Sequence, residues 1–142
     1  MSEDIRLFVY GSLLKGERDH GLLEGAQFVG AARTAAVYTL VDLGPYAALL
    51  ENGRVSVAGE LYVIDKKQRF TLDVKRECPV LFQRIEVRLD DDTVAETYAM
   101  RDEQVRGKRR LGHGDWRRRF EPKRRAESAP GLMGPYGRRG PR

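Results

Sequence analysis

Apolar and polar residues alternate, or apolar residues run together, in several short segments between residues 5 and 100. Period-two alternation and short apolar runs bounded by Gly, Pro, Asn or Asp are typical of β-strands. The pattern predicts strands over residues 5–10, 26–44 (one bent strand or two), 55–65, 80–90 and 93–100. Gly30 interrupts the second segment and predicts a β-bulge there.

The segments between these strands carry turn residues. Residues 43–49 contain Pro45 and predict a turn. Asn52 and Gly53 stand between apolar segments and predict a β-hairpin. The stretch "ERDHGLLEG", 17–25, is short and interrupted by glycine, so at most one or two helical turns are expected there.

The period changes over residues 65–77, where the sequence predicts a helix. Asp65 is suited to cap its N-terminus, because a carboxylate there accepts from otherwise unpaired backbone N–H groups. Phe70 and Val74, with Leu72 and Cys78 as further candidates, are assigned to one helical stripe. Strands joined in sequence, with one helix between them, predict an α+β fold: a small mixed or antiparallel β-barrel with flanking short helices.

The length of 142 residues, with 41% hydrophobic and 33% charged residues, indicates a single globular domain. No apolar run approaches the roughly 18 to 20 residues that a membrane helix needs, and the acidic N-terminus lacks a signal sequence. One cysteine excludes an internal disulfide and fits a reducing compartment. These features predict a cytoplasmic location and no membrane partner.

The net charge of +5 is unevenly distributed. Residues 117–142 contain nine Lys/Arg against two Glu, whereas residues 1–116 contain 17 basic and 19 acidic residues. We therefore expect a folded domain over 1–116 and a disordered Arg/Gly/Pro-rich tail over 117–142. Such a tail either contacts nucleic acid or another polyanion, or is a solubilising extension, which is the favoured interpretation.

Candidate chemistry is limited by the residues that are absent. Two histidines and one cysteine are too few and too scattered for a zinc site, and no phosphate loop or dinucleotide fingerprint occurs, so no metal or cofactor is expected. Acid–base chemistry by a carboxylate remains, with Glu77 as the candidate. Its apolar neighbours predict partial desolvation and a raised pKa. On the residues alone, an ordinary solvated glutamate is the favoured alternative.

The stretch "LFVYGSLLKGERDHGLL" resembles the opening of the gamma-glutamylcyclotransferase-like family, in which an apolar strand ends in Tyr-Gly-Ser-Leu. "FVGAA", "LGPYAAL" and "VAGELYVID" follow in the family's order. "TLDVKRECPVLFQRIEV" is similar to its helix-then-strand segment, and "GDW" to a closing motif of its small bacterial branch. The resemblance covers about residues 5–116. It implies a barrel with a pocket at its mouth, and release of 5-oxoproline from a gamma-glutamyl amine or amide.

The resemblance also implies roles for individual residues. Tyr10, Gly11, Ser12 and Leu13 match the segment that cradles the glutamyl head of the substrate through backbone groups. A glycine there allows close approach, and successive N–H groups form an anion-binding concavity. The substrate's own α-amine attacks its side-chain amide carbon, so the enzyme supplies positioning and one glutamate as general acid/base, which is Glu77 here.

The sequence departs from the family pattern near that glutamate. The family commonly shows Leu-Asp, two residues and then the catalytic Glu; in this register the chain has Arg76, and Glu77 comes one place later. One helical residue rotates a side chain by about 100°, which is enough to point it away from a pocket. Phe82 stands where a Tyr is usual. Tyr46 and Tyr98 are expected either in the pocket wall or in the core.

Three hypotheses follow, in order of preference. The first is a cyclotransferase that acts on a small gamma-glutamyl compound, with Glu77 as acid/base. The second is a catalytically silent binding domain with the same pocket, favoured by Arg76 in the register of the glutamate. The third is an adaptor whose basic tail, 117–142, contacts a polyanion.

Overall fold

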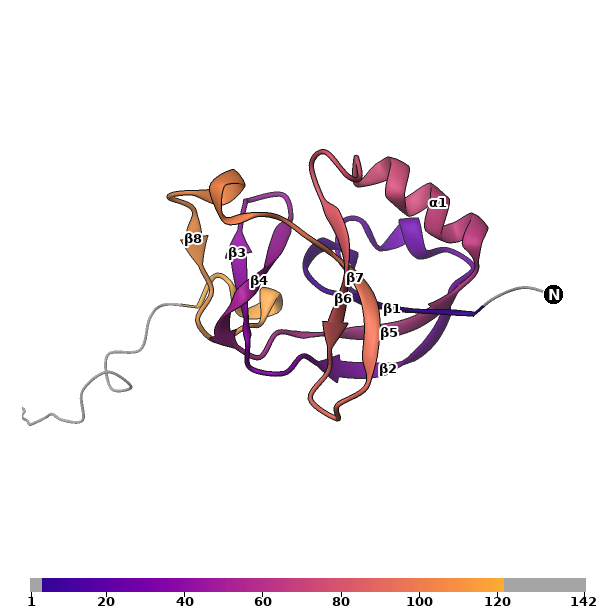
Figure 1. The fold of residues 1–142 in the computed structure, drawn as a ribbon, viewed down its shortest axis with the longest axis horizontal. Coiled ribbons are helices and arrows are strands. Elements are labelled where there is room, and N and C mark those ends of the chain that lie inside the picture. The colour runs from indigo at the N-terminus through magenta and orange to yellow at the C-terminus, as the bar shows by residue number, and fades with distance from the viewer. Residues whose placement is uncertain (1–3, 122–142) are drawn as a thin grey trace, which may run out of the picture.

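The computed structural model describes residues 4–121, which form one mixed β-sheet with a single α-helix beside it (Figure 1). The strands of this part of the chain are β1 Ile5–Val9, β2 Gln27–Arg33, β3 Tyr38–Asp42, β4 Ala47–Val55, β5 Ala58–Ile64, β6 Gln83–Arg88, β7 Val94–Ala99 and β8 Arg109–Arg110. The α-helix is α1, Lys66–Lys75, and the short 3-10 helices are η1 Gly11–Leu13, η2 His20–Leu23, η3 Asp102–Val105 and η4 Trp116–Arg118. The predicted α+β class is confirmed.

The strands are ordered β2-β5-β1-β7-β4-β3-β8, with β6 paired to β7. β7 runs parallel to β1 and β4, whereas the other pairs are antiparallel. The sheet wraps around a core but its strand ladders do not close, so the predicted barrel describes it only loosely. An isolated antiparallel bridge between Thr34, which follows β2, and Leu89, which follows β6, connects the ends of these two strands.

The two positions at which the sequence predicts an interruption of a strand have different outcomes. The register between β2 and β5 shifts between Phe28 and Gly30, which confirms the predicted bulge. The hairpin predicted at Asn52 and Gly53 is wrong, because β4 continues through both residues. There the register with β3 jumps. Gly53 has a φ of 154°, and a Cβ added at this position would overlap Thr39 Oγ1. The Asn-Gly pair therefore forms an irregularity inside one strand.

Helix α1 begins where the sequence predicts but buries a different face. Asp65 caps it: its Oδ1 accepts from Gln68 N at 2.8 Å, and Gln68 Oε1 accepts from Asp65 N at 2.9 Å. Leu72 is buried, whereas Phe70 and Val74 are 68% and 58% exposed, so the predicted stripe is wrong for these two residues. Phe70 and Val74 are four residues apart and share a face, and Leu72 lies about 200° from Phe70. The apolar spacing alone did not identify which face would be covered.

The segment after the predicted domain boundary contacts the rest of the chain. Arg117 donates to Lys15 O, and the Arg119 guanidinium lies 4.0 Å from the centre of the Trp116 ring. Residues 122–142, which hold most of the predicted basic tail, fall outside the described residues. Within residues 4–121, no helix combines the length and hydropathy needed to cross a membrane.

Candidate functional site

The buried strand β1 ends at Val9, and at Tyr10 the chain turns sharply into η1. Leu7, Phe8 and Val9 are at most 1% exposed, so the strand passes through the core before this turn. Gly11 has a φ of 65°, and a Cβ there would lie 2.8 Å from the Ala47 Cβ. A residue with a side chain would be strained here, both by the positive φ and by the contact with Ala47.

A small cavity lies beside this turn, between β1, the start of β4, the end of α1 and β7. It is lined by Phe8, Val9, Tyr10, Leu13, Ala47, Arg76, Phe82, Thr97 and Tyr98. With the side chains in these positions, its volume of about 10 Å³ leaves room for about one water molecule. The side chains that line the cavity therefore occupy most of the space between these elements.

The structure brings most of the predicted substrate-binding residues to this place. Four of them line the cavity: Tyr10, Leu13, Phe82 and Tyr98. Gly11 and Ser12 belong to the same turn, and both are buried. The Tyr46 ring packs against the Phe82 ring, with centroids 5.8 Å apart.

Glu77, the predicted acid/base, is placed differently. It is exposed, has a left-handed φ of 53°, and is not among the residues that line the cavity. Arg76, the residue in the register of the family's glutamate, lines the cavity and is 8% exposed. The positively charged neighbour thus occupies the place expected for the carboxylate.

Two phenols in the cavity wall donate their protons to acceptors within the protein. Tyr10 OH donates to Tyr98 O at 2.5 Å and accepts from Leu49 N at 2.9 Å. Tyr98 OH donates to Asp73 Oδ1 at 2.6 Å. Burial raises the pKa of both phenols, and the Asp73 carboxylate raises the pKa of Tyr98 further. Both stay protonated near neutral pH and fix the walls without acting as bases.

Arg76 is less completely paired. Within residues 4–121 its side chain donates one hydrogen bond, from Nη2 to Ser12 Oγ at 3.4 Å. Its Nη1 lies 4.0 Å from Asp19 Oδ2. The guanidinium also lies 5.3 Å from the centre of the Phe82 ring and 5.9 Å from that of Tyr46, within the range of cation–π contacts. A guanidinium carries five N–H donors, so most of its hydrogen-bonding capacity is unused by these contacts.

Asp19 completes a small polar cluster with Ser12 and Arg76, and sequence reasoning missed it. Ser12 Oγ donates to Asp19 Oδ2 at 2.6 Å, and Asp19 N donates to Ser12 O at 2.8 Å. These bonds close the loop between η1 and η2 and hold the carboxylate beside the guanidinium. Nothing in the local sequence pattern predicts this closure, because it joins residues seven positions apart across an irregular loop.

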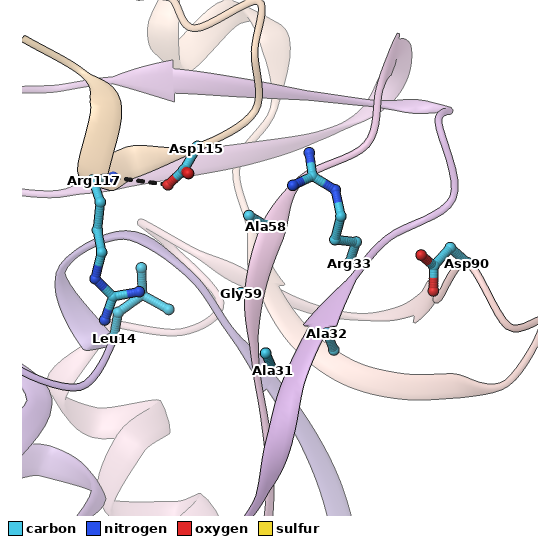
Figure 2. Close-up of a pocket in the computed structure, with 9 residues that line it drawn as sticks. All are labelled: Leu14, Ala31, Ala32, Arg33, Ala58, Gly59, Asp90, Asp115 and Arg117. Carbon is cyan, nitrogen blue, oxygen red and sulfur yellow. Dashed lines mark hydrogen bonds between the residues drawn. The ribbon is translucent and has the colours of Figure 1, made fainter. Parts of the chain in front are cut away.

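A second, larger hollow lies away from this site and contains none of the predicted site residues. Its volume is about 470 Å³, and its lining is Leu14, Ala31, Ala32, Arg33, Ala58, Gly59, Asp90, Asp115 and Arg117 (Figure 2). Arg33 already donates to Ser56 Oγ and O, Asp115 Oδ1 accepts from the Arg117 backbone N, and the Arg117 guanidinium donates to Lys15 O and Glu60 Oε2, so these three side chains have partners within the protein. Within residues 4–121, no group of three or more His, Cys, Asp or Glu side chains is placed to hold a metal ion.

Comparison with known proteins identifies the class to which this fold and site belong. The family model described as "Gamma-glutamyl cyclotransferase, AIG2-like" matches residues 7–118. The chain belongs to this family. The matched region includes the 10–13 turn, the cavity and the Asp19 cluster.

Individual relatives support the same assignment. A Vibrio cholerae protein provisionally named gamma-glutamylcyclotransferase is 41% identical over 78 residues, covering 55% of this chain and 67% of its own. The Homo sapiens gamma-glutamylaminecyclotransferase is 34% identical over 92 residues, covering 58% and 60%. The matched segments thus span about two thirds of these relatives or less.

Solved structures share the fold. An AIG2-like protein from Mus musculus superposes with a TM-score of 0.62 at 26% identity, over 69% of this chain and 78% of its own. A protein specific to uropathogenic E. coli superposes with a TM-score of 0.72 at 21% identity, over 82% of this chain and 95% of its own. The second likeness concerns the fold alone.

Proposed function

We propose that this chain releases 5-oxoproline from a small gamma-glutamyl amine or amide. One observation carries the proposal: Tyr10 and Leu13 of the Tyr-Gly-Ser-Leu strand end line a single cavity together with Phe82 and Tyr98. Membership of the gamma-glutamyl cyclotransferase family, and relatives named gamma-glutamylaminecyclotransferase, support the same activity.

The reaction requires little covalent chemistry from the protein. The α-amine of the substrate attacks its γ-carbonyl carbon, the bond from that carbon to the leaving nitrogen breaks, and the proton lost by the attacking amine ends on the leaving amine. The products are 5-oxoproline and a free amine. The protein holds the glutamyl chain in its folded conformation and excludes water, and backbone N–H groups of the 10–13 turn stabilise the developing oxyanion.

Two features of the cavity bear on this mechanism. The space of about 10 Å³ is too small for a glutamyl head, so the Arg76 side chain has to move when a substrate enters. Glu77 is exposed and lies outside the lining, so its role in proton transfer stays a prediction from the sequence.

A second function is binding of a gamma-glutamyl compound without turnover. The placement of Arg76 in the cavity, with Glu77 outside it, favours this candidate. A protein of this kind would retain the recognition of the glutamyl head but lack the group that moves the proton.

The test is incubation of the protein with a panel of gamma-glutamyl amines and amides, with 5-oxoproline measured by chromatography and binding by calorimetry. Catalytic formation of 5-oxoproline supports the first function. Saturable binding without product supports the second. Absence of both rejects the two together. Comparing Glu77→Gln with Glu51→Gln, which alters another exposed glutamate, tests the predicted acid/base: a selective loss of rate at position 77 supports it.

A further inference from the structure

We infer that Arg76 and Asp19 together bind the free α-amino acid end of the ligand, with the guanidinium on its carboxylate and the aspartate on its ammonium group. The inference rests on the proposed function in that the ligand is a gamma-glutamyl compound. It names the residues that recognise the charged end of that compound, whether or not turnover follows.

The incomplete pairing of Arg76 points to an anionic ligand. A buried guanidinium normally forms several charge-assisted hydrogen bonds, because water no longer solvates it. Arg76 is 8% exposed, yet its side chain donates one long hydrogen bond within residues 4–121, at 3.4 Å to Ser12 Oγ. The aromatic rings of Tyr46 and Phe82 contact the guanidinium but accept no conventional hydrogen bond from it. A carboxylate would provide the planar, two-oxygen acceptor that a guanidinium binds best.

Asp19 provides the opposite charge at the same place. Its side chain is 26% exposed, so a ligand can reach it, and Ser12 Oγ fixes its orientation at 2.6 Å. The distance of 4.0 Å between Arg76 Nη1 and Asp19 Oδ2 is at the outer limit of an ion pair. Arg18 also faces Asp19, with Nε 3.8 Å from Oδ1, but its side chain is 67% exposed and solvated.

An α-amino acid end fits between these two charges. Its ammonium and carboxylate groups are attached to the same carbon. It therefore replaces the 4.0 Å contact between Arg76 and Asp19 with two shorter ion pairs, one from its carboxylate to Arg76 and one from its ammonium to Asp19. Movement of the Arg76 side chain toward this carboxylate also empties the cavity that it now lines, which opens space beside the 10–13 turn for the rest of the ligand. The Asp19 carboxylate can take one proton from this ammonium, which frees the lone pair that attacks the γ-carbonyl carbon; this proton and the second one lost in ring closure end on the leaving amine.

The inference predicts that both charges of the ligand are needed. The probes for calorimetry with the full chain are gamma-glutamyl methylamide, glutaric acid mono-methylamide (no ammonium), N-methyl-4-aminobutanamide (no carboxylate) and L-norvaline, an α-amino acid that cannot form 5-oxoproline. Loss of either charge is expected to weaken binding by about 10- to 100-fold. Norvaline is expected to bind, because it retains both charges.

Variants assign each charge to its residue. Arg76→Gln should remove the preference for the carboxylate but keep the preference for the ammonium, and Asp19→Asn should do the reverse. Arg101→Gln, which removes an exposed arginine that pairs with Glu103, is the matched control and should change neither preference. Circular dichroism and thermal unfolding establish that each variant is folded, and the comparison of ligands on the unmodified protein does not depend on the variants.

The outcomes separate this inference from the proposed function. If norvaline binding depends on Arg76 and Asp19 but no gamma-glutamyl amine yields 5-oxoproline, the inference stands and turnover is rejected. If 5-oxoproline forms while Arg76→Gln and Asp19→Asn keep the ligand preferences unchanged, the function stands and the inference is overturned. Equal affinity for all the probes, or binding of none of them, also overturns it.

Discussion

Two charged residues, Glu60 and Arg76, are each 8% exposed, but their surroundings differ sharply. Glu60 lies on β5, and its carboxylate accepts hydrogen bonds from Lys15 N at 3.0 Å, Tyr62 OH at 3.0 Å and Arg117 Nη2 at 3.4 Å. Arg76 follows α1, lines a cavity and donates one hydrogen bond of 3.4 Å within the described residues. Equal burial therefore accompanies very unequal pairing.

The difference separates a structural charge from one that binds a ligand. A buried charge with a full set of partners stabilises the arrangement around it, and here Glu60 connects the loop after η1, strand β5 and the 3-10 helix η4. A buried charge with few partners costs free energy in the absence of a ligand. Protein families retain such costs at sites where a ligand supplies the missing contacts.

The largest effect on the free energy of unfolding is expected at Glu60, the buried charge that has a full set of partners. Glu60→Ala leaves three donors without their acceptor, and because Arg117 is partly exposed we expect the unfolding free energy to fall by about 2–3 kcal/mol. Urea unfolding measures this loss. Glu51→Ala, which removes an exposed glutamate on β4, should change the value by less than about 0.5 kcal/mol. Similar values for the two variants would contradict the structural role of Glu60.

Removing the charge of Arg76 should change the free energy of unfolding in the opposite direction. Arg76→Met keeps an unbranched apolar stem and removes the poorly paired charge, so we expect the unfolding free energy to rise by about 1 kcal/mol without ligand. Norvaline binding should be lost in the same variant. Destabilisation by more than about 2 kcal/mol would mean that the guanidinium is a structural group after all.

The hydrogen bond from Tyr62 to Glu60 makes stability depend on pH in the alkaline range. Burial and the neighbouring Glu60 carboxylate raise the pKa of Tyr62 to about 12. The folded protein holds the phenolic proton of Tyr62 more tightly than the unfolded chain does. The stability that this proton contributes to the fold is therefore complete below about pH 10 and is lost as pH rises through about 12. Tyr62→Phe should cost about 1 kcal/mol at neutral pH and should reduce the loss of stability above pH 10. Parallel pH profiles of the two proteins in urea unfolding would refute this.

The smallest effect is expected at Glu77. Glu77→Gln changes an exposed side chain outside the cavity, so stability should change by less than about 0.5 kcal/mol and norvaline affinity by less than about two-fold. Calorimetry and urea unfolding check both values. Loss of binding in this variant would place Glu77, and not only Arg76, in the recognition of the ligand.

Several features of the fold could be predicted because they depend on local chemistry. The buried strand that ends just before Tyr10, the bulge at Gly30 and the cap at Asp65 each follow from residue types in a short window. Asn52 and Gly53 were wrongly assigned to a hairpin, since positive φ is needed equally in a turn and in a bulge. The exposed face of α1, with Phe70 and Val74, depends on which neighbour covers the helix.

Part of the candidate site could be predicted because it also depends on residue types within a short stretch of the sequence. The 10–13 turn and its aromatic neighbours were identified from a motif in the sequence, and they lie together around the cavity. The direction of Arg76 and Glu77 depends on how the chain leaves α1, where Glu77 adopts a left-handed conformation. The place of Asp19 depends on a loop closed by its own hydrogen bonds with Ser12. Neither arrangement is encoded in a periodic pattern.

The most direct measurement is an NMR titration that follows the Nε–Hε signal of Arg76, assigned by its absence in Arg76→Gln. As norvaline or gamma-glutamyl methylamide is added, we expect this signal to shift and to saturate with the affinity found by calorimetry, while the signal of Arg101 stays in place. A bound ligand that shifts the backbone signals of the 10–13 turn but leaves Arg76 unmoved would contradict the claim that this guanidinium receives the ligand's carboxylate.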